Sequence, residues 1–148
     1  MTPTALYALI QSDATAAAFF AAGNDTACAV RCGVIAPPIR QRVAADRIQE
    51  AASLNGMWGT LKIAALNTQL TDPPRGAAIA FIDWVEAGRP LDMDNTAVQT
   101  MAATLVTYSL ATAEQIAQLS ALADTPQTFT AADVGTARQE GVSVNGVT

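Results

Sequence analysis

The chain has 148 residues, 51% hydrophobic and 14% charged, so it is long enough to bury a core and too apolar for intrinsic disorder. It has no histidine and a single lysine, Lys62, and so lacks most side chains that enzymes use for proton transfer and nucleophile activation. Its longest apolar stretches, 16–22 and 77–82, are far shorter than the roughly 20 residues of a membrane-spanning helix. Residues 1–12 lack the basic residues of a secretory signal, so we expect a cytoplasmic product, or a virion component made there.

The net charge of −5 is unevenly distributed along the chain. Residues 1–62 carry five basic and four acidic groups, whereas residues 63–148 carry three basic and nine acidic groups. Because acidic surfaces repel phosphate backbones, we expect no nucleic-acid partner. Four arginines close together in sequence have no aromatic residue among them, and we expect them to form a solvated or protein-contacting face. They are Arg31, Arg40, Arg42 and Arg47.

Capping residues predict three short helices at the start of the chain. Thr2 before Pro3 is typical of a helix start, and Ser12 and Asn24 are the expected caps of the next two helices. The predicted helices cover residues 3–11, 14–22 and 25–32, with Gly23 and Gly33 as terminators. Each is too short to be stable alone, so we expect them to pack together.

Cys28 and Cys32 are the only cysteines and would lie one turn apart on the same helix face. They could form half of a metal site or a redox pair, but a chain without histidine would need carboxylates as the other zinc ligands. Alanine and valine flank both cysteines, which favours two small buried side chains instead.

The middle of the chain predicts one short strand and then a return to helix. Pro37 and Pro38 break the helical pattern. Apolar and polar side chains then alternate imperfectly over residues 39–43, which predicts a short edge strand with 127–129 as its candidate partner. Apolar spacing and Gly or Pro stops then predict the remaining helices. They cover about residues 45–55, 57–66, 73–87, 95–107, 112–122 and 130–139.

These elements predict a mainly α fold, a compact bundle of about six to eight short helices with a minimal two-stranded β element. We expect one domain over residues 1–140. Residues 141–148 contain two glycines and no core pattern, so we expect a flexible tail. The chain has few large side chains, and we expect them to contribute much of the hydrophobic energy of folding. The candidates are Phe19, Phe20, Trp58, Phe81, Trp84 and Leu105.

Trp58 and Trp84 have two possible roles. An exposed tryptophan indicates a contact site, because tryptophan is enriched at the energetic centres of interfaces. At helical spacing among alanines, each is more typical of a core anchor.

A search for reactive groups finds no enzyme motif. Without histidine no Ser-His-Asp or Cys-His arrangement can form, and no phosphate-binding loop is present. The run from Asp92 to Asn95 is superficially similar to a calcium loop but lacks its glycine and its terminal glutamate, which favours Asp94 or Asn95 as a helix cap. Asp46 and Glu50, one turn apart, suit a surface charge ladder with Arg42. We therefore expect no catalytic residue, no cofactor, no metal and no small-molecule substrate.

Four segments of the second half share a pattern of helix stops and caps: 87–92 (AGRPLD), 96–98 (TAV), 111–115 (ATAEQ) and 129–134 (FTAADV). Together they resemble small proteins encoded in tailed-bacteriophage genomes, a largely uncharacterised phage and prophage family. In those proteins a helix leads through a threonine- and alanine-bearing turn into a second helix, and then into a final helix with an arginine, matched here by Arg138. The resemblance spans about residues 75–139. It implies a phage origin and a role in the virion or its assembly, and it brings no catalytic residues.

The leading hypothesis is a non-enzymatic bacteriophage structural protein of the neck, tail or capsid exterior, located in the virion. Its expected partners are other phage structural proteins and copies of itself, with no membrane contact. The alternatives are a small acidic phage inhibitor of a host or defence protein, or an assembly chaperone. The candidate interaction residues are Arg40, Arg42, Arg47, Trp58 and Trp84.

Overall fold

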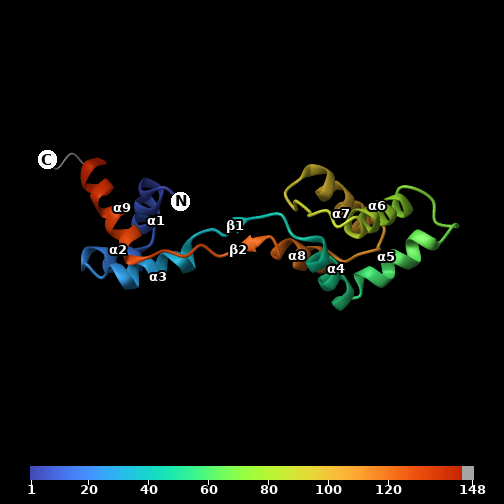
Figure 1. The fold of residues 1–148 in the computed structure, drawn as a ribbon, viewed down its shortest axis with the longest axis horizontal. Coiled ribbons are helices and arrows are strands. Elements are labelled where there is room, and N and C mark those ends of the chain that lie inside the picture. Colours follow the sequence, from blue (N-terminus) through green and yellow to red (C-terminus); the bar gives the residue numbers. More distant parts are fainter. Residues whose placement is uncertain (145–148) are drawn as a thin grey trace. The chain divides into compact units, whose positions relative to one another are not determined.

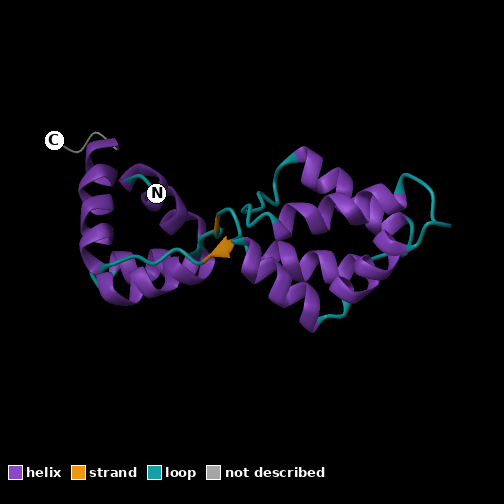
Figure 2. Cartoon of the chain, turned by 45° about the vertical axis from the view of Figure 1, so that its right-hand side comes forward, coloured by secondary structure: helices purple, strands orange, loops and turns teal. Residues whose placement is uncertain are grey.

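A computed structural model describes residues 1–144 of the chain. Nine helices occur among these residues, which make the structure 67% helical, and a two-stranded antiparallel sheet accompanies them. Figure 2 shows the helices in purple and the two short strands in orange. The predicted mainly α class with a minimal β element is therefore confirmed. No helix in the described part of the chain is long and apolar enough to cross a membrane.

The contacts within the chain divide it into two compact units. Among the described residues, unit 1 comprises 1–39 and 126–144, and unit 2 comprises 40–125. The expected single α-helical domain over residues 1–140 stays a prediction. The buried hydrophobic side chains form two clusters, one in each unit.

Unit 1 joins the two ends of the sequence. The C-terminal helix α9, red in Figure 1, packs against the blue N-terminal helix α1 and also contacts α3. The helices of this unit are α1 (Pro3–Ser12), α2 (Ala14–Ala21), α3 (Asp25–Ile35) and α9 (Ala131–Val144). Its buried core is Leu6, Ile10, Ala16, Cys28, Ala29, Cys32, Val134 and Ala137.

Side-chain caps start the helices of unit 1. Thr2 Oγ1 accepts a hydrogen bond from the Ala5 N–H at 3.2 Å, and Asn24 Oδ1 accepts one from Ala27 at 3.1 Å. The cap of α2 is Asp13, not Ser12, since the carboxylate of Asp13 accepts from the Ala16 N–H at 2.8 Å. Both residues can cap a helix, and their order in the sequence does not decide between them.

Two helices of unit 1 extend beyond the ends that Gly33 and Gly141 predicted. α3 continues through Gly33 to Ile35, and Gly33 instead allows a close approach, because a Cβ there would lie 3.3 Å from the carbonyl oxygen of Gln127. α9 continues to Val144 rather than ending near Gln139, and Gly141 is buried within it. The rest of the expected tail, residues 145–148, lies outside the described residues.

Unit 2 is a continuous run of five helices around the larger core. The helices are α4 (Ala45–Leu54), α5 (Met57–Leu66), α6 (Pro74–Glu86), α7 (Thr96–Thr107) and α8 (Ala113–Ala121). Its largest fully buried side chains are Ile48, Met57, Leu61, Leu91, Leu105 and Leu119. The predicted capping box of α8 is present, with Thr112 and Gln115 each accepting from the other's N–H.

Residues 39–43, expected as one strand, have two different partners. β1 (Ile39–Arg40) pairs with β2 (Asp124–Thr125) in the two-stranded sheet, so the expected partner 127–129 was three residues too late. Val43 instead forms an antiparallel bridge with Leu91, through two reciprocal hydrogen bonds of 2.8 Å. The pairing is too short for the alternation of side chains to specify its register.

Gly135 and Gly141, both in α9, form a matched pair for testing the packing of this helix. We expect Gly135→Ala to raise the free energy of unfolding by roughly 0.5–1 kcal/mol, because alanine favours helix and nothing lies near the added Cβ. We expect Gly141→Ala to lower it, since the added Cβ would collide with the Tyr7 ring, which stands edge-on against Phe20. Urea unfolding followed by far-UV circular dichroism measures both changes. Equal gains from the two substitutions would contradict the packing of α9 on α1.

Candidate functional site

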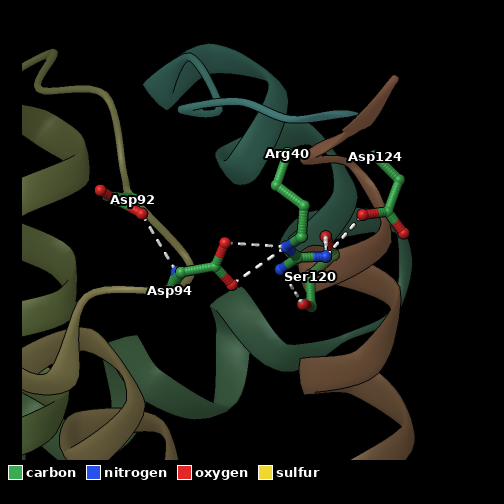
Figure 3. A network of polar contacts seen from close by, with 5 residues as sticks. All are labelled: Arg40, Asp92, Asp94, Ser120 and Asp124. Carbon is green, nitrogen blue, oxygen red and sulfur yellow. Dashed lines mark hydrogen bonds and ion pairs between the residues drawn. The ribbon is translucent and has the colours of Figure 1, made fainter. Parts of the chain in front are cut away.

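Arg40 is the centre of the densest polar network in the described chain (Figure 3). Its Nε lies 3.0 Å from both carboxylate oxygens of Asp94. Its Nη1 donates to Asp124 Oδ1 at 2.5 Å and to the Ser120 carbonyl at 3.5 Å, and its Nη2 donates to Ser120 Oγ at 2.9 Å. Strand β1, the segment before α7, α8 and β2 therefore all meet at one guanidinium.

The local turn before α7 places Asp94 for this contact. Asp92 Oδ1 accepts a hydrogen bond from the Asp94 N–H at 3.1 Å, which holds the segment in a tight turn, and Asn95 then caps the helix. The Asp94 carboxylate, and secondarily the Asp124 carboxylate, raises the pKa of Arg40 above its ordinary value. The guanidinium donates to protein acceptors on all three nitrogens, which leaves little of it to bind a phosphate. This arrangement suits a structural clasp.

The other arginines have separate neighbours. Arg42 is exposed and lies before α4, with its Nε 3.9 Å from Asp92 Oδ2, so it does not share a helix with Asp46 as the expected charge ladder requires. Arg47 is exposed on α4. Arg31 belongs to unit 1, where its ion pair with Asp13 at 2.6 Å lowers the pKa of that carboxyl to about 2.

Trp58 has the role of a core anchor. It is half-buried on α5, packs against the core of unit 2 and meets the Phe81 ring edge-on, with centroids 6.4 Å apart. The Lys62 ammonium lies 5.4 Å from the centre of the Trp58 ring and also pairs with Glu86. Side chains of unit 2 thus contact the Trp58 ring, both at the core and at Lys62.

Trp84 lies on the surface of α6, so the interpretation as a core anchor was wrong for it. The residue is 40% exposed. Its indole N–H donates to the Pro90 carbonyl at 3.4 Å, and the Arg89 guanidinium lies 5.9 Å from the ring centre. The polar edge of the ring is satisfied within the chain, and what faces solvent is apolar.

Sequence reasoning missed several exposed aliphatic side chains. On α5, Ile63 is 72% exposed and Leu66 is 80% exposed; on α3, Val30 and Val34 are 68% and 71% exposed. Each pair is spaced so that both members share one helix face. A helical wheel could have shown these faces, but alanine-rich helices leave open which apolar side is buried.

The two thiols are structural. Cys28 and Cys32 are completely buried and form no disulfide. Cys28 Sγ donates a hydrogen bond to the Ala16 carbonyl at 3.5 Å. Burial raises the pKa of Cys28 and raises that of Cys32 to about 12. The interpretation as small buried side chains is confirmed. Within the described residues, no three cysteine or carboxylate side chains gather where they could hold a metal ion.

The chain matches no protein-family model, and comparisons with curated proteins and with solved structures found no match either.

The Arg40 clasp is tested by replacing it with the other basic side chain. Arg40→Lys keeps the charge but loses the planar fork that reaches Asp94, Asp124 and Ser120 together. We expect the urea midpoint of unit 2 to fall, measured by fluorescence of Trp58 and Trp84. The control Arg42→Lys, which changes one exposed contact of 3.9 Å, should leave it unchanged. Equal midpoints for both variants would show that the clasp does not secure the fold.

The buried thiols give a second prediction. In the folded protein we expect Cys28 and Cys32 to resist a disulfide reagent, because both are fully buried and their thiolate forms are strongly disfavoured. Both should react at once in denaturant. Fast reaction of either thiol under native conditions, followed by absorbance, would indicate an accessible redox or metal-binding pair.

Proposed function

We propose that this chain is a non-enzymatic structural protein of a bacteriophage virion that works by protein–protein packing in several copies. One observation carries the proposal: every buried side chain in the described residues is apolar or a thiol, whereas large aliphatic and aromatic side chains lie exposed on helices of both units. Exposed apolar faces on rigid helices are typical of surfaces that contact other proteins.

The interior gives little support to the enzyme alternative. In the part of the chain that the structure describes, no polar or charged side chain is buried, so no buried pair of carboxylates is present for acid–base chemistry. Active sites usually place such groups in dry clefts, where their pKa values shift. The resemblance of residues 75–139 to tailed-bacteriophage proteins supports the virion as the place of assembly.

The second candidate, an acidic inhibitor of a basic host protein, rests on the surface charge. Asp46 and Glu50 on α4 and Glu114 on α8 are exposed, in a chain of net charge −5. Such a surface would steer the chain toward a basic partner. It favours a one-to-one complex over an array of copies.

The mass of the purified chain in solution separates these functions. We expect light scattering after size exclusion to give multiples of the 15.3 kDa chain, and negative-stain microscopy to show a ring or a regular array. Mass spectrometry of particles of a phage that carries this sequence should find the chain at a constant copy number. A monomer at every concentration that is also absent from particles would overturn the proposal, and a stoichiometric complex with one basic host protein would establish the inhibitor.

A further inference from the structure

A groove of about 470 Å³ lies between α7 and α8 in unit 2. Most of the side chains that line it are apolar. Its α7 wall includes Val98, Ala102 and Val106, and its α8 wall includes Ala113 and Ile116. The groove therefore offers an apolar floor along two helices.

One end of the groove carries more negative than positive charge. Asp94 and Asp124 both pair with the guanidinium of Arg40, at 3.0 and 2.5 Å, so two carboxylates share one cation (Figure 3). The neighbouring pair of Asp92 and Arg42 is balanced. The Asp94 side chain is 56% exposed, and within the described chain its oxygens accept only from the Arg40 Nε. Because a carboxylate has about four lone-pair sites, Asp94 can bind one more cation.

Other apolar hollows of the described chain lack this imbalance. The groove between α6 and α7 is lined by no charged side chain. The hollow along α3 contains Arg31, whose charge is balanced by Asp13. A neutral hollow does not indicate which protein covers it. The excess negative charge beside the α7–α8 groove does, since it selects a partner of opposite charge.

We propose that the groove between α7 and α8 binds an amphipathic helix of another protein, with its apolar stripe on the floor and a lysine or arginine at Asp94. Binding of a helix in a groove commonly combines apolar anchors with charged contacts at the rim. The alanines on both walls let a helix approach closely. This inference goes beyond the proposed function, because it concerns a partner other than a copy of the chain and does not require copies to assemble.

A second copy of the chain is poorly suited to this groove. A copy would bring a net charge of −5 to a surface of the same sign. Of the other basic side chains, Arg75 donates to the Ala65 carbonyl, and Arg47 on α4 has Glu50 one turn away. Five of the eight basic residues already pair with carboxylates of their own chain: Arg31, Arg40, Arg42, Lys62 and Arg138. A different protein, one with basic side chains to spare, therefore fits the groove better.

Synthetic stapled helices are suitable probes, because short helices without a staple are marginal in water. The first probe has a leucine stripe and lysines at its ends. The second replaces the lysines with glutamates, and the third replaces the leucines with alanines. We expect the first to shift the NMR signals of α7 and α8 in the ¹⁵N-labelled chain, and the other two to bind at least about tenfold more weakly. Shifts confined to other helices, or equal binding of the glutamate probe, would overturn the inference.

Gln99 allows a test of charge that leaves the Arg40 clasp intact. Its side chain lines the groove and is exposed. We expect Gln99→Lys to weaken binding of the lysine probe and Gln99→Glu to strengthen it, with affinities about tenfold apart. The controls Gln49→Lys and Gln49→Glu make the same changes of charge at an exposed position of α4, and both should bind as the unsubstituted chain does. Equal affinities of the two Gln99 variants, or the same difference at Gln49, would overturn the inference.

Circular dichroism checks that each variant folds. If a Gln99 variant unfolds, Ala103→Lys and Ala103→Glu on the same wall of the groove take its place. The mass of the chain in solution is measured alongside, which separates the two proposals. An unsubstituted chain that stays monomeric but binds the lysine probe at α7 and α8 would contradict assembly from several copies and support this inference.

Discussion

The fold depends on packing between helices that are too short to be stable alone. The longest, α9, has 14 residues and α2 has only eight, whereas isolated helices in water are marginal below about 12–15 residues. Alanine favours these helices but buries little area, so a few larger side chains hold each core together. In unit 2 these include Leu61 and Leu105, and in unit 1 Leu6 and Ile10. No polar side chain is buried among the described residues, so the interior serves packing alone.

Polar contacts in this protein position segments at the surface. The Arg40 clasp joins pieces of unit 2 that are more than fifty residues apart in sequence, and Arg138 in α9 pairs with Asp25 in α3 at 2.5 Å. Exposed ion pairs contribute little stability individually, so their main effect is to select one arrangement of the loops. Three helices, α1, α2 and α7, contain no charged side chain at all.

Local signals predicted the helices well, and long-range contacts decided what they could not. The capping box of Thr112 and Gln115 and the cap at Asn24 lie within one helical turn, so their sequence sufficed. The partners of Arg40 come from segments distant in sequence, which no local pattern specifies. Trp84 was misplaced because α6 carries apolar residues on two sides, and spacing alone does not show which side faces the core.

The central claim is that copies of the chain assemble through helix faces that expose large apolar side chains. Hydrogen–deuterium exchange at two protein concentrations, one below and one above the onset of association, tests it most directly. The account predicts that amides of at least one helix that exposes large apolar side chains, α3, α5 or α6, become more protected at the higher concentration. Protection of these helices that is independent of concentration would contradict the account.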